Sequence, residues 1–122
     1  MANPSAVPAS AAGTEILRRS HSNIPSTSNV TLLDGVANYT YTIISIVFCN
    51  MSSSDAEEIN MWVSADATTE VRLLTESPLP AKGTFIWNDK IMLSDTDELI
   101  ARLAGGTGDV DVLLTYIEQR WA

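Results

Sequence analysis

The sequence has 122 residues, of which 45% are hydrophobic, and this suits one folded domain of ordinary composition. No apolar run approaches the ~18 residues of a membrane-spanning helix, so a membrane protein of that type is excluded. The formal net charge is −8, and an acidic surface of this kind repels phosphate backbones, which argues against nucleic-acid binding.

Residues 1–26 differ in composition from the rest of the chain. They are rich in alanine, serine and proline, so they cannot bury enough apolar surface to fold alone. One interpretation is a disordered tail, and the other is an extended arm that becomes ordered along a neighbouring subunit. In the second interpretation, which we favour, Ile16 and Leu17 are apolar anchors, and Arg18 and Arg19 make charge contacts with the partner.

From residue 27 onwards the pattern is that of β-strands. A first strand is expected at 29–33, closed by the turn signal Asp34-Gly35, and the longest strand is expected at 39–50. Strict alternation in that long strand divides its apolar side chains between two faces. One face holds Tyr39, Tyr41, Ile43, Val47 and Cys49, and the other holds Ile44, Ile46 and Phe48. Apolar residues on both faces indicate either a strand covered on both sides or one face used in a subunit contact.

Six further strands are expected, at 59–65, at 70–74, in three short segments within 78–103, and at 110–117. Alternation places Trp62 on the outer side of its strand, and it places Leu99, Ala101 and Leu103 on one face. About eight strands with frequent turns predict an all-β fold, a single antiparallel β-sandwich that is immunoglobulin-like or jelly-roll-like. We expect this domain to span residues 27–122, after the extended N-terminal arm.

The sequence offers few groups that could carry chemistry. One histidine and one cysteine exclude the usual zinc sites. His21 lies in the polar arm, where it is expected to be solvated, and Cys49 is expected to be a small buried hydrophobe. Asp95, Asp97 and Glu98 could hold a calcium ion, but their spacing matches no known calcium loop, and a solvated turn is the preferred interpretation. We therefore expect no catalytic residue, metal or cofactor.

Aromatic side chains at strand spacing are the remaining candidates. They could stack on sugar rings, but aromatic residues in strands more often lie in a core or in a subunit interface. We therefore assign them as possible interface aromatics, namely Tyr39, Tyr41, Trp62 and Trp87.

Several segments together resemble small β-sandwich structural proteins of tailed bacteriophages. The resemblance covers about residues 28–118, and it includes the turn Pro78-Leu-Pro80-Ala-Lys-Gly83 before the central strands and a closing strand that ends in Tyr116-Ile-Glu118. The family's acidic residue after the strand at 91–93 is matched by Asp95 or Asp97. The glycine expected just before this acidic residue is absent.

The resemblance implies a virion structural protein that is synthesised in the cytoplasm of the bacterial host and has no enzymatic activity. The expected role is a head decoration (cement) or accessory subunit, a homo-oligomer such as a trimer, which binds the major capsid protein and stabilises the particle. One alternative is a tail or fibre adaptor subunit. An alternative of another class is a carbohydrate-binding module that reads host surface polysaccharide through exposed Trp62 or Trp87.

Overall fold

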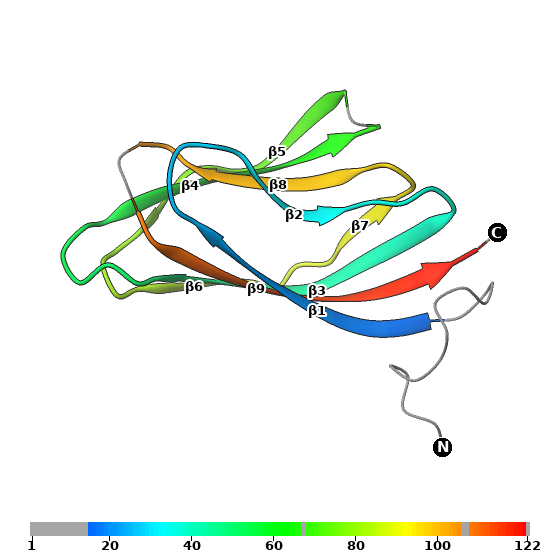
Figure 1. Cartoon of the computed structure of the whole chain (residues 1–122), viewed down its shortest axis with the longest axis horizontal. Helices are drawn as coiled ribbons and strands as arrows, with labels where there is room; N and C mark the ends of the chain where they lie inside the picture. Colours follow the sequence, from blue (N-terminus) through cyan, green and yellow to red (C-terminus); the bar gives the residue numbers. More distant parts are fainter. Residues whose placement is uncertain (1–14, 67, 106–107, 122) are drawn as a thin grey trace, which may run out of the picture.

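The structure is a computed structural model that describes residues 15–66, 68–105 and 108–121. Within these residues no helix is long and apolar enough to cross a membrane. The regular elements of the described chain are strands joined by turns and loops (Figure 1). The strands are β1 (Glu15–Ile24), β2 (Val30–Asp34), β3 (Tyr39–Asn50), β4 (Glu57–Ala65), β5 (Thr69–Leu79), β6 (Thr84–Trp87), β7 (Ile91–Ser94), β8 (Glu98–Leu103) and β9 (Val110–Arg120).

These strands form two antiparallel sheets, which lie one above the other in Figure 1. Sheet A has the order β1-β9-β3-β6, and β7 also pairs with β3; sheet B has the order β2-β8-β4-β5. The first strand pairs with the last, the second with the one before the last, and β4 with β5, so the chain is folded back on itself. This pairing is that of a jelly roll. The expected all-β sandwich is confirmed. Of the two expected architectures, immunoglobulin-like and jelly-roll-like, the strand pairing matches the jelly roll.

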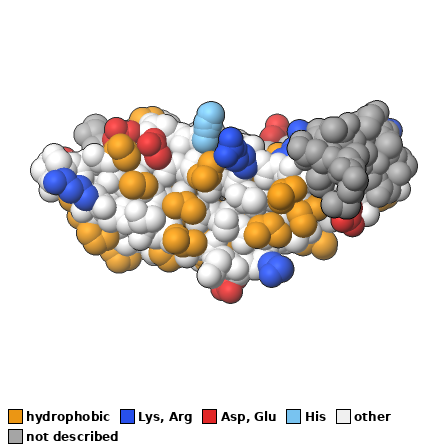
Figure 2. All heavy atoms as spheres, turned by 90° about the horizontal axis from the view of Figure 1, so that it is seen from below, with side chains coloured by type: hydrophobic (Ala, Val, Ile, Leu, Met, Phe, Trp, Pro, Cys, Tyr) orange, Lys and Arg blue, Asp and Glu red, His pale blue; other side chains and the backbone are white. Residues whose placement is uncertain are grey.

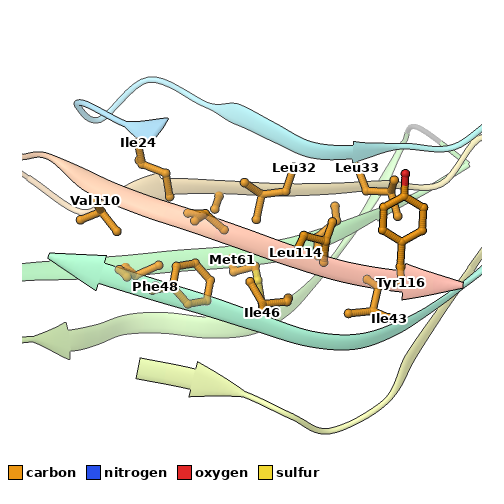
Figure 3. Close-up of a cluster of buried hydrophobic side chains, with 14 of the residues drawn as sticks. Ile24, Leu32, Leu33, Ile43, Ile46, Phe48, Met61, Val110, Leu114 and Tyr116 are labelled. Atoms are coloured by element: carbon orange, nitrogen blue, oxygen red, sulfur yellow. The ribbon is translucent and has the colours of Figure 1, made fainter. Parts of the chain in front are cut away.

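The hydrophobic core lies between the two sheets (Figure 3). Side chains of β1, β3 and β9 in sheet A meet side chains of β2, β4 and β8 in sheet B. The alternation expected in β8 is confirmed, because Leu99, Ala101 and Leu103 are all completely buried. Each large aliphatic side chain buried in this way contributes roughly 1.5–3 kcal/mol to folding. The largest completely buried residues include Ile24, Ile43, Ile46, Phe48, Met61 and Leu114.

The long strand β3 contains a β-bulge that changes which residues face the core. Its pairing with β9 shifts register between Ile43 and Ser45, so Ile44 is the extra residue. Ile43 and Ile46 are consequently both buried, although they are three positions apart. The faces expected from strict alternation are therefore wrong beyond the bulge. Ile46 and Phe48 join Tyr41 and Ile43 in the core, and Val47 and Cys49 point outward.

Cys49 is only half-buried, which corrects the expectation that it is a buried hydrophobe. The bulge turns its side chain to the outer side of sheet A, where it lies next to Asp111 in the strand pairing. The sulfur of Cys49 also approaches the sulfur of Met51 at 3.9 Å. The thiol is therefore part of the molecular surface of sheet A and not part of the core.

Residues 15–24 form β1, and this corrects the expected arm over residues 1–26. This strand pairs with β9 from Glu15 opposite Gln119 to Ile24 opposite Val110. Its two ends are fixed in the core by Ile16 and Ile24, which are both buried. An edge strand needs only a few inward apolar side chains, and so a polar segment of this composition can still belong to the sheet. Residues 1–14 of the expected arm lie outside the described residues.

The three short strands expected within residues 78–103 are present as β6, β7 and β8. They do not stay in one sheet, because β6 and β7 pair with β3 in sheet A, whereas β8 pairs with β2 and β4 in sheet B. The turn between β7 and β8 packs against the turn after β2. There the amide of Gly35 donates to the carbonyl of Asp97 at 2.9 Å, and a Cβ at Gly35 would meet the carbonyl oxygens of Asp95 and Asp97.

Candidate interaction surface

The acidic residues after β7 hold turns together. The two carboxylate oxygens of Asp97 accept hydrogen bonds from the amides of Asp66, at 2.9 Å, and Ser94, at 3.1 Å. The carboxylate of Asp95 accepts from the amide of Asn38 at 2.9 Å. Three side chains able to hold a metal ion are not found together anywhere in the described residues. The arrangement therefore gives these carboxylates a structural task.

Trp62 is on the outer side of sheet B, as the alternation indicates, but only 3% of it is exposed. The guanidinium of Arg72 lies 4.4 Å from the centre of its ring system, and that of Arg102 lies 5.9 Å away. These cation–π contacts cover the face on which a sugar would stack. The expectation of an exposed Trp62 is thus wrong.

Trp87 is half-buried and packs against the core from β6. Its indole N–H donates to the carbonyl of Asp89 at 2.8 Å. The side chain faces the other sheet, because Trp87 pairs with buried Ile46 of β3. Trp62 therefore has no open ring face for a sugar, and Trp87 is turned toward the core instead of outward.

The two tyrosines expected at an interface lie in an aromatic cluster at one end of the core. Tyr39 and Tyr41 stack at 6.1 Å, and Tyr41 meets Tyr116 edge to face at 6.0 Å. The hydroxyl of Tyr41 accepts a hydrogen bond from the amide of Val36 at 3.1 Å. Burial raises the pKa of Tyr41, and that of Tyr116 as well. These tyrosines close the end of the sandwich.

The four residues expected to anchor the arm are separated by the alternation of β1. Ile16 is buried in the chain's own core, whereas Leu17 points away from it and is exposed. The guanidinium of Arg18 pairs with the carboxylate of Glu118 at 3.1 Å. Arg19 is exposed on the same side of the strand as Leu17. Leu17 and Arg19 therefore lie on the outer side of the strand, whereas the exposed Arg18 is held in an ion pair within the chain.

The side of sheet A that points away from the core carries many apolar side chains. We call it the outer face of sheet A, and Figure 2 shows it from below, with hydrophobic side chains spread over most of its length. Four of its residues are among the most exposed apolar residues described: Leu17 is 55%, Ile86 is 56%, Met92 is 68% and Leu113 is 42% exposed. Its apolar members come from all the strands of the sheet: Leu17, Val47, Ile86, Met92, Leu113 and Ile117.

Strand register arranges these side chains in rows across the sheet. In one row, Leu113 of β9 lies between His21 of β1 and Val47 of β3. Val47 in turn pairs with Ile86 of β6. Directly opposed side chains in neighbouring strands lie close enough to touch. The row is therefore a continuous apolar band that starts at His21 and ends at the free edge of β6.

A second row crosses the sheet nearer the start of β1. Ile117 of β9 pairs with Leu17 of β1 on one side and with Thr42 of β3 on the other. Thr42 then pairs with Met92 of β7. This second row is apolar at Leu17, Ile117 and Met92 and is interrupted by Thr42, so the outer face has two mainly apolar bands that cross the sheet.

A shallow hollow of about 540 Å³ lies beside the first row and is lined by residues of β1, β9 and β3. Val47, Cys49 and Leu113 provide its apolar lining, and His21, Asn23 and Asp111 provide its polar lining. The amide of Asn23 donates to the carboxylate of Asp111 at 2.9 Å, which fixes the polar side. The face therefore has both raised and recessed parts, and this allows its side chains to interdigitate with those of another surface.

Full charges are few on the outer face of sheet A and numerous on sheet B. Among the outward side chains described in sheet A, Glu15, Arg19 and Asp111 carry full charges, and all three belong to β1 or β9. In sheet B, Asp34, Glu98, Ser64 and Glu70 follow one another in a single row across the four strands. This row of acidic side chains therefore lies away from the apolar bands, on the side of sheet B that also carries Arg72 and Arg102.

The sequence alone predicts only part of this surface. The two apolar faces of the strand at 39–50 pointed to a subunit contact, and Val47 does lie on the outer face. Ile86, Met92 and Leu113 were not identified, although each alternates with buried or half-buried apolar residues in its strand. The sequence does not show that their strands are neighbours in one sheet, and without this information the three residues cannot be recognised as one surface.

No family model matches the chain, and no curated protein matches it. Solved structures do match. A chain from the disulfide-linked pili of Bacillus endospore appendages has a TM-score of 0.53 and 6% identity, covering 96% of this chain and 97% of that chain. Drosophila NLP-core, whose structure concerns pentamer formation and histone binding, has a TM-score of 0.54 and 12% identity, covering 87% of this chain and 99% of that chain. At these identities the likeness establishes the fold alone.

A capsid chain of Helicobacter pylori bacteriophage KHP30 matches at a TM-score of 0.40 and 12% identity, covering 84% of this chain and 92% of that chain. This likeness is too weak to support any argument about the present chain.

Proposed function

We propose that the chain is a structural subunit of a tailed-bacteriophage virion, a head decoration or accessory subunit that binds the particle and stabilises it. The observation that carries this proposal is the apolar outer face of sheet A, which a single sandwich leaves uncovered. Exposed apolar surface of this extent marks a contact with another protein.

The sequence resemblance to β-sandwich structural proteins of tailed phages supports the virion part of the proposal. The shared fold supports the assembly part, since the matching Bacillus chain comes from pili and the Drosophila structure concerns a pentamer. Both are proteins in which a small domain is repeated in an assembly. We extend this property, and not histone binding, to the present chain.

The proposed mechanism is mechanical. Two hydrogen-bonded sheets form a rigid body, and its apolar outer face attaches to other subunits while acidic sheet B is turned to solvent. Residues 1–14, the part of the expected arm before β1, would extend the attachment to the major capsid protein. Arg19 and Leu17 at the start of the outer face lie where such an extension would begin its contact.

A second candidate is a subunit of a filament or of a tail, such as the tail or fibre adaptor expected above. The observation that favours it is the match with the pilus chain over almost the full length of both chains. Electron microscopy of the purified protein separates the two, because a filament subunit would polymerise and a decoration subunit would give discrete oligomers.

The proposal is tested with virus particles that lack the protein. Deletion of the gene should give particles that release their DNA at lower temperature, and added purified protein should bind to them and restore the original temperature. Variant Ile86→Asp, which places a charge on the outer face, should bind far less. Particles that are unchanged by the deletion and do not bind the protein would contradict the role in stabilisation.

A further inference from the structure

We infer that the outer face of sheet A is covered by a second copy of this chain. The inference deepens the proposed function, on which it rests, by naming the partner at this surface. A contact between two copies must satisfy three physical conditions: the charges must not repel, the contact area must be sufficient, and the two surfaces must fit in shape.

The scarcity of charge on the outer face of sheet A allows a second copy to approach there. Two copies with a net charge of −8 each repel one another wherever acidic surfaces meet. The row that contains Asp34, Glu98 and Glu70 on sheet B would oppose such an approach. The outward residues of β3, β6 and β7 carry no charge. The centres of two such faces can therefore come into contact without repulsion between acidic groups.

The area is sufficient for a specific contact. Strands of about ten residues at ~3.3 Å per residue, with about 4.8 Å between strands, give sheet A a face of roughly 600 Å². Contact between two such faces would bury about 1,200 Å², which is the lower end of the range for stable protein interfaces. The contact would thus reach the size of a specific protein interface.

The shape of the face is suited to packing against itself. Ile86 and Met92 protrude, and the hollow lined by Val47, Cys49 and Leu113 recedes. Sheets that pack face to face interdigitate their side chains at a separation of about 10 Å. Protruding side chains of one copy can therefore occupy the hollow of the other, which would also cover the thiol of Cys49.

The test measures self-association of the full-length chain by sedimentation at several concentrations. The wild type should have at least twice the 13.2 kDa mass of one chain. Ile86→Asp should sediment as a single chain, with self-association weakened about a hundredfold or more because an unpaired charge would be buried. Val71→Asp is the control: Val71 is 50% exposed in β5, in the other sheet and away from the outer face of sheet A, so this variant should still associate.

Folding of each variant is checked by circular dichroism, and Leu113→Asp replaces Ile86→Asp if the latter does not fold. The rate of thiol labelling at Cys49 gives an independent readout. Labelling should be at least several-fold slower in associated wild type than in Ile86→Asp, and dilution of the wild type should remove the difference. A wild type that stays a single chain at all concentrations would overturn the inference. Association that survives both outer-face substitutions would overturn it equally.

These outcomes are distinct from failure of the proposed function. A single chain that still binds particles would overturn the homotypic contact and keep the virion role, with another virion subunit as the occupant of the face. A protein that associates with itself but never binds particles would keep the homotypic contact and overturn the virion role.

Discussion

Arg72 lies with its guanidinium 4.4 Å from the centre of the Trp62 ring system. The two residues are directly opposed in β5 and β4, so strand register brings them together. Because of this contact, a large aromatic side chain on the outer side of sheet B is removed from solvent. The two sheets of the jelly roll therefore differ on their outer sides: sheet B covers its aromatic residue with arginine, whereas sheet A leaves aliphatic residues open.

Replacing Arg72 by alanine should expose Trp62 and lower the free energy of unfolding by about 0.5–1 kcal/mol, the usual value of a cation–π contact at a partly exposed site. The ion pair between Arg72 and Glu70 adds little, since both side chains are exposed. Urea denaturation measures the loss. Arg102→Ala is the control, because Arg102 lies 5.9 Å from the ring and should cost less. An equal cost for both variants would contradict the assignment.

Replacing Phe48 by alanine should lower the free energy of unfolding by about 3–5 kcal/mol, because Phe48 is completely buried in the core. Val47→Ala, at the neighbouring position on the outer face, should have a small effect on unfolding of the isolated domain and a larger effect on association. Thermal unfolding at low and high protein concentration separates the two effects. Comparable losses in both variants at low concentration would mean that Val47 also lies in the core.

Two truncations distinguish the arm from the sheet. Removing residues 1–14 should leave the melting temperature of the domain nearly unchanged and weaken binding to particles. Removing residues 1–24 also deletes β1 and the buried side chains of Ile16 and Ile24, at a cost of roughly 3–6 kcal/mol. Such a loss approaches the whole stability of a typical domain, so the shorter fragment should be unfolded or aggregated. Circular dichroism and calorimetry provide the comparison.

Glu57 should make stability depend on pH. Burial, with a smaller effect of the Asp55 charge, raises the pKa of this carboxyl from its ordinary value of 4.5. The folded state then holds its proton at a pH where the unfolded state has lost it. The resulting stability is fully present below about pH 4.5 and is lost as the pH rises through the raised pKa of the folded state.

Glu57→Gln should consequently remove this loss and make the protein more stable than the wild type at neutral pH. Denaturation measured from pH 4 to pH 7 tests this, with the exposed neighbour Glu58 changed to Gln as the control. A difference between Glu57→Gln and the wild type that shrinks as the pH rises would have the wrong sign.

Alternation of apolar residues was sufficient to predict the β-sandwich and the approximate position of most strands. The prediction of which side chains face the core was wrong where the alternation of the strand is interrupted. The bulge at Ile44 adds one residue to β3, and every later side chain in that strand is turned to the opposite face. Cys49 was expected in the core because it lies in the apolar run at 43–49, and nothing in the local sequence shows that the bulge turns its side chain outward.

Strand β1 and Trp62 were misjudged for a different reason. Between Ile16 and Ile24 the inward positions of β1 are Arg18, Ser20 and Ser22, which look like an unstructured segment until β9 is known to lie beside them. Trp62 was expected to be exposed because its cover, Arg72, belongs to another strand. Contacts between distant parts of the chain determine both the pairing of β1 and the burial of Trp62. Such contacts cannot be inferred from a single sequence.

The most direct test of the account is the number of copies of the chain in purified virus particles, measured by quantitative mass spectrometry against the major capsid protein. A decoration subunit should be present in many copies, in a fixed ratio to the capsid protein set by the symmetry of the head. A few copies per particle would indicate the tail or fibre position instead. Absence of the chain from purified particles would contradict the proposed role in the virion.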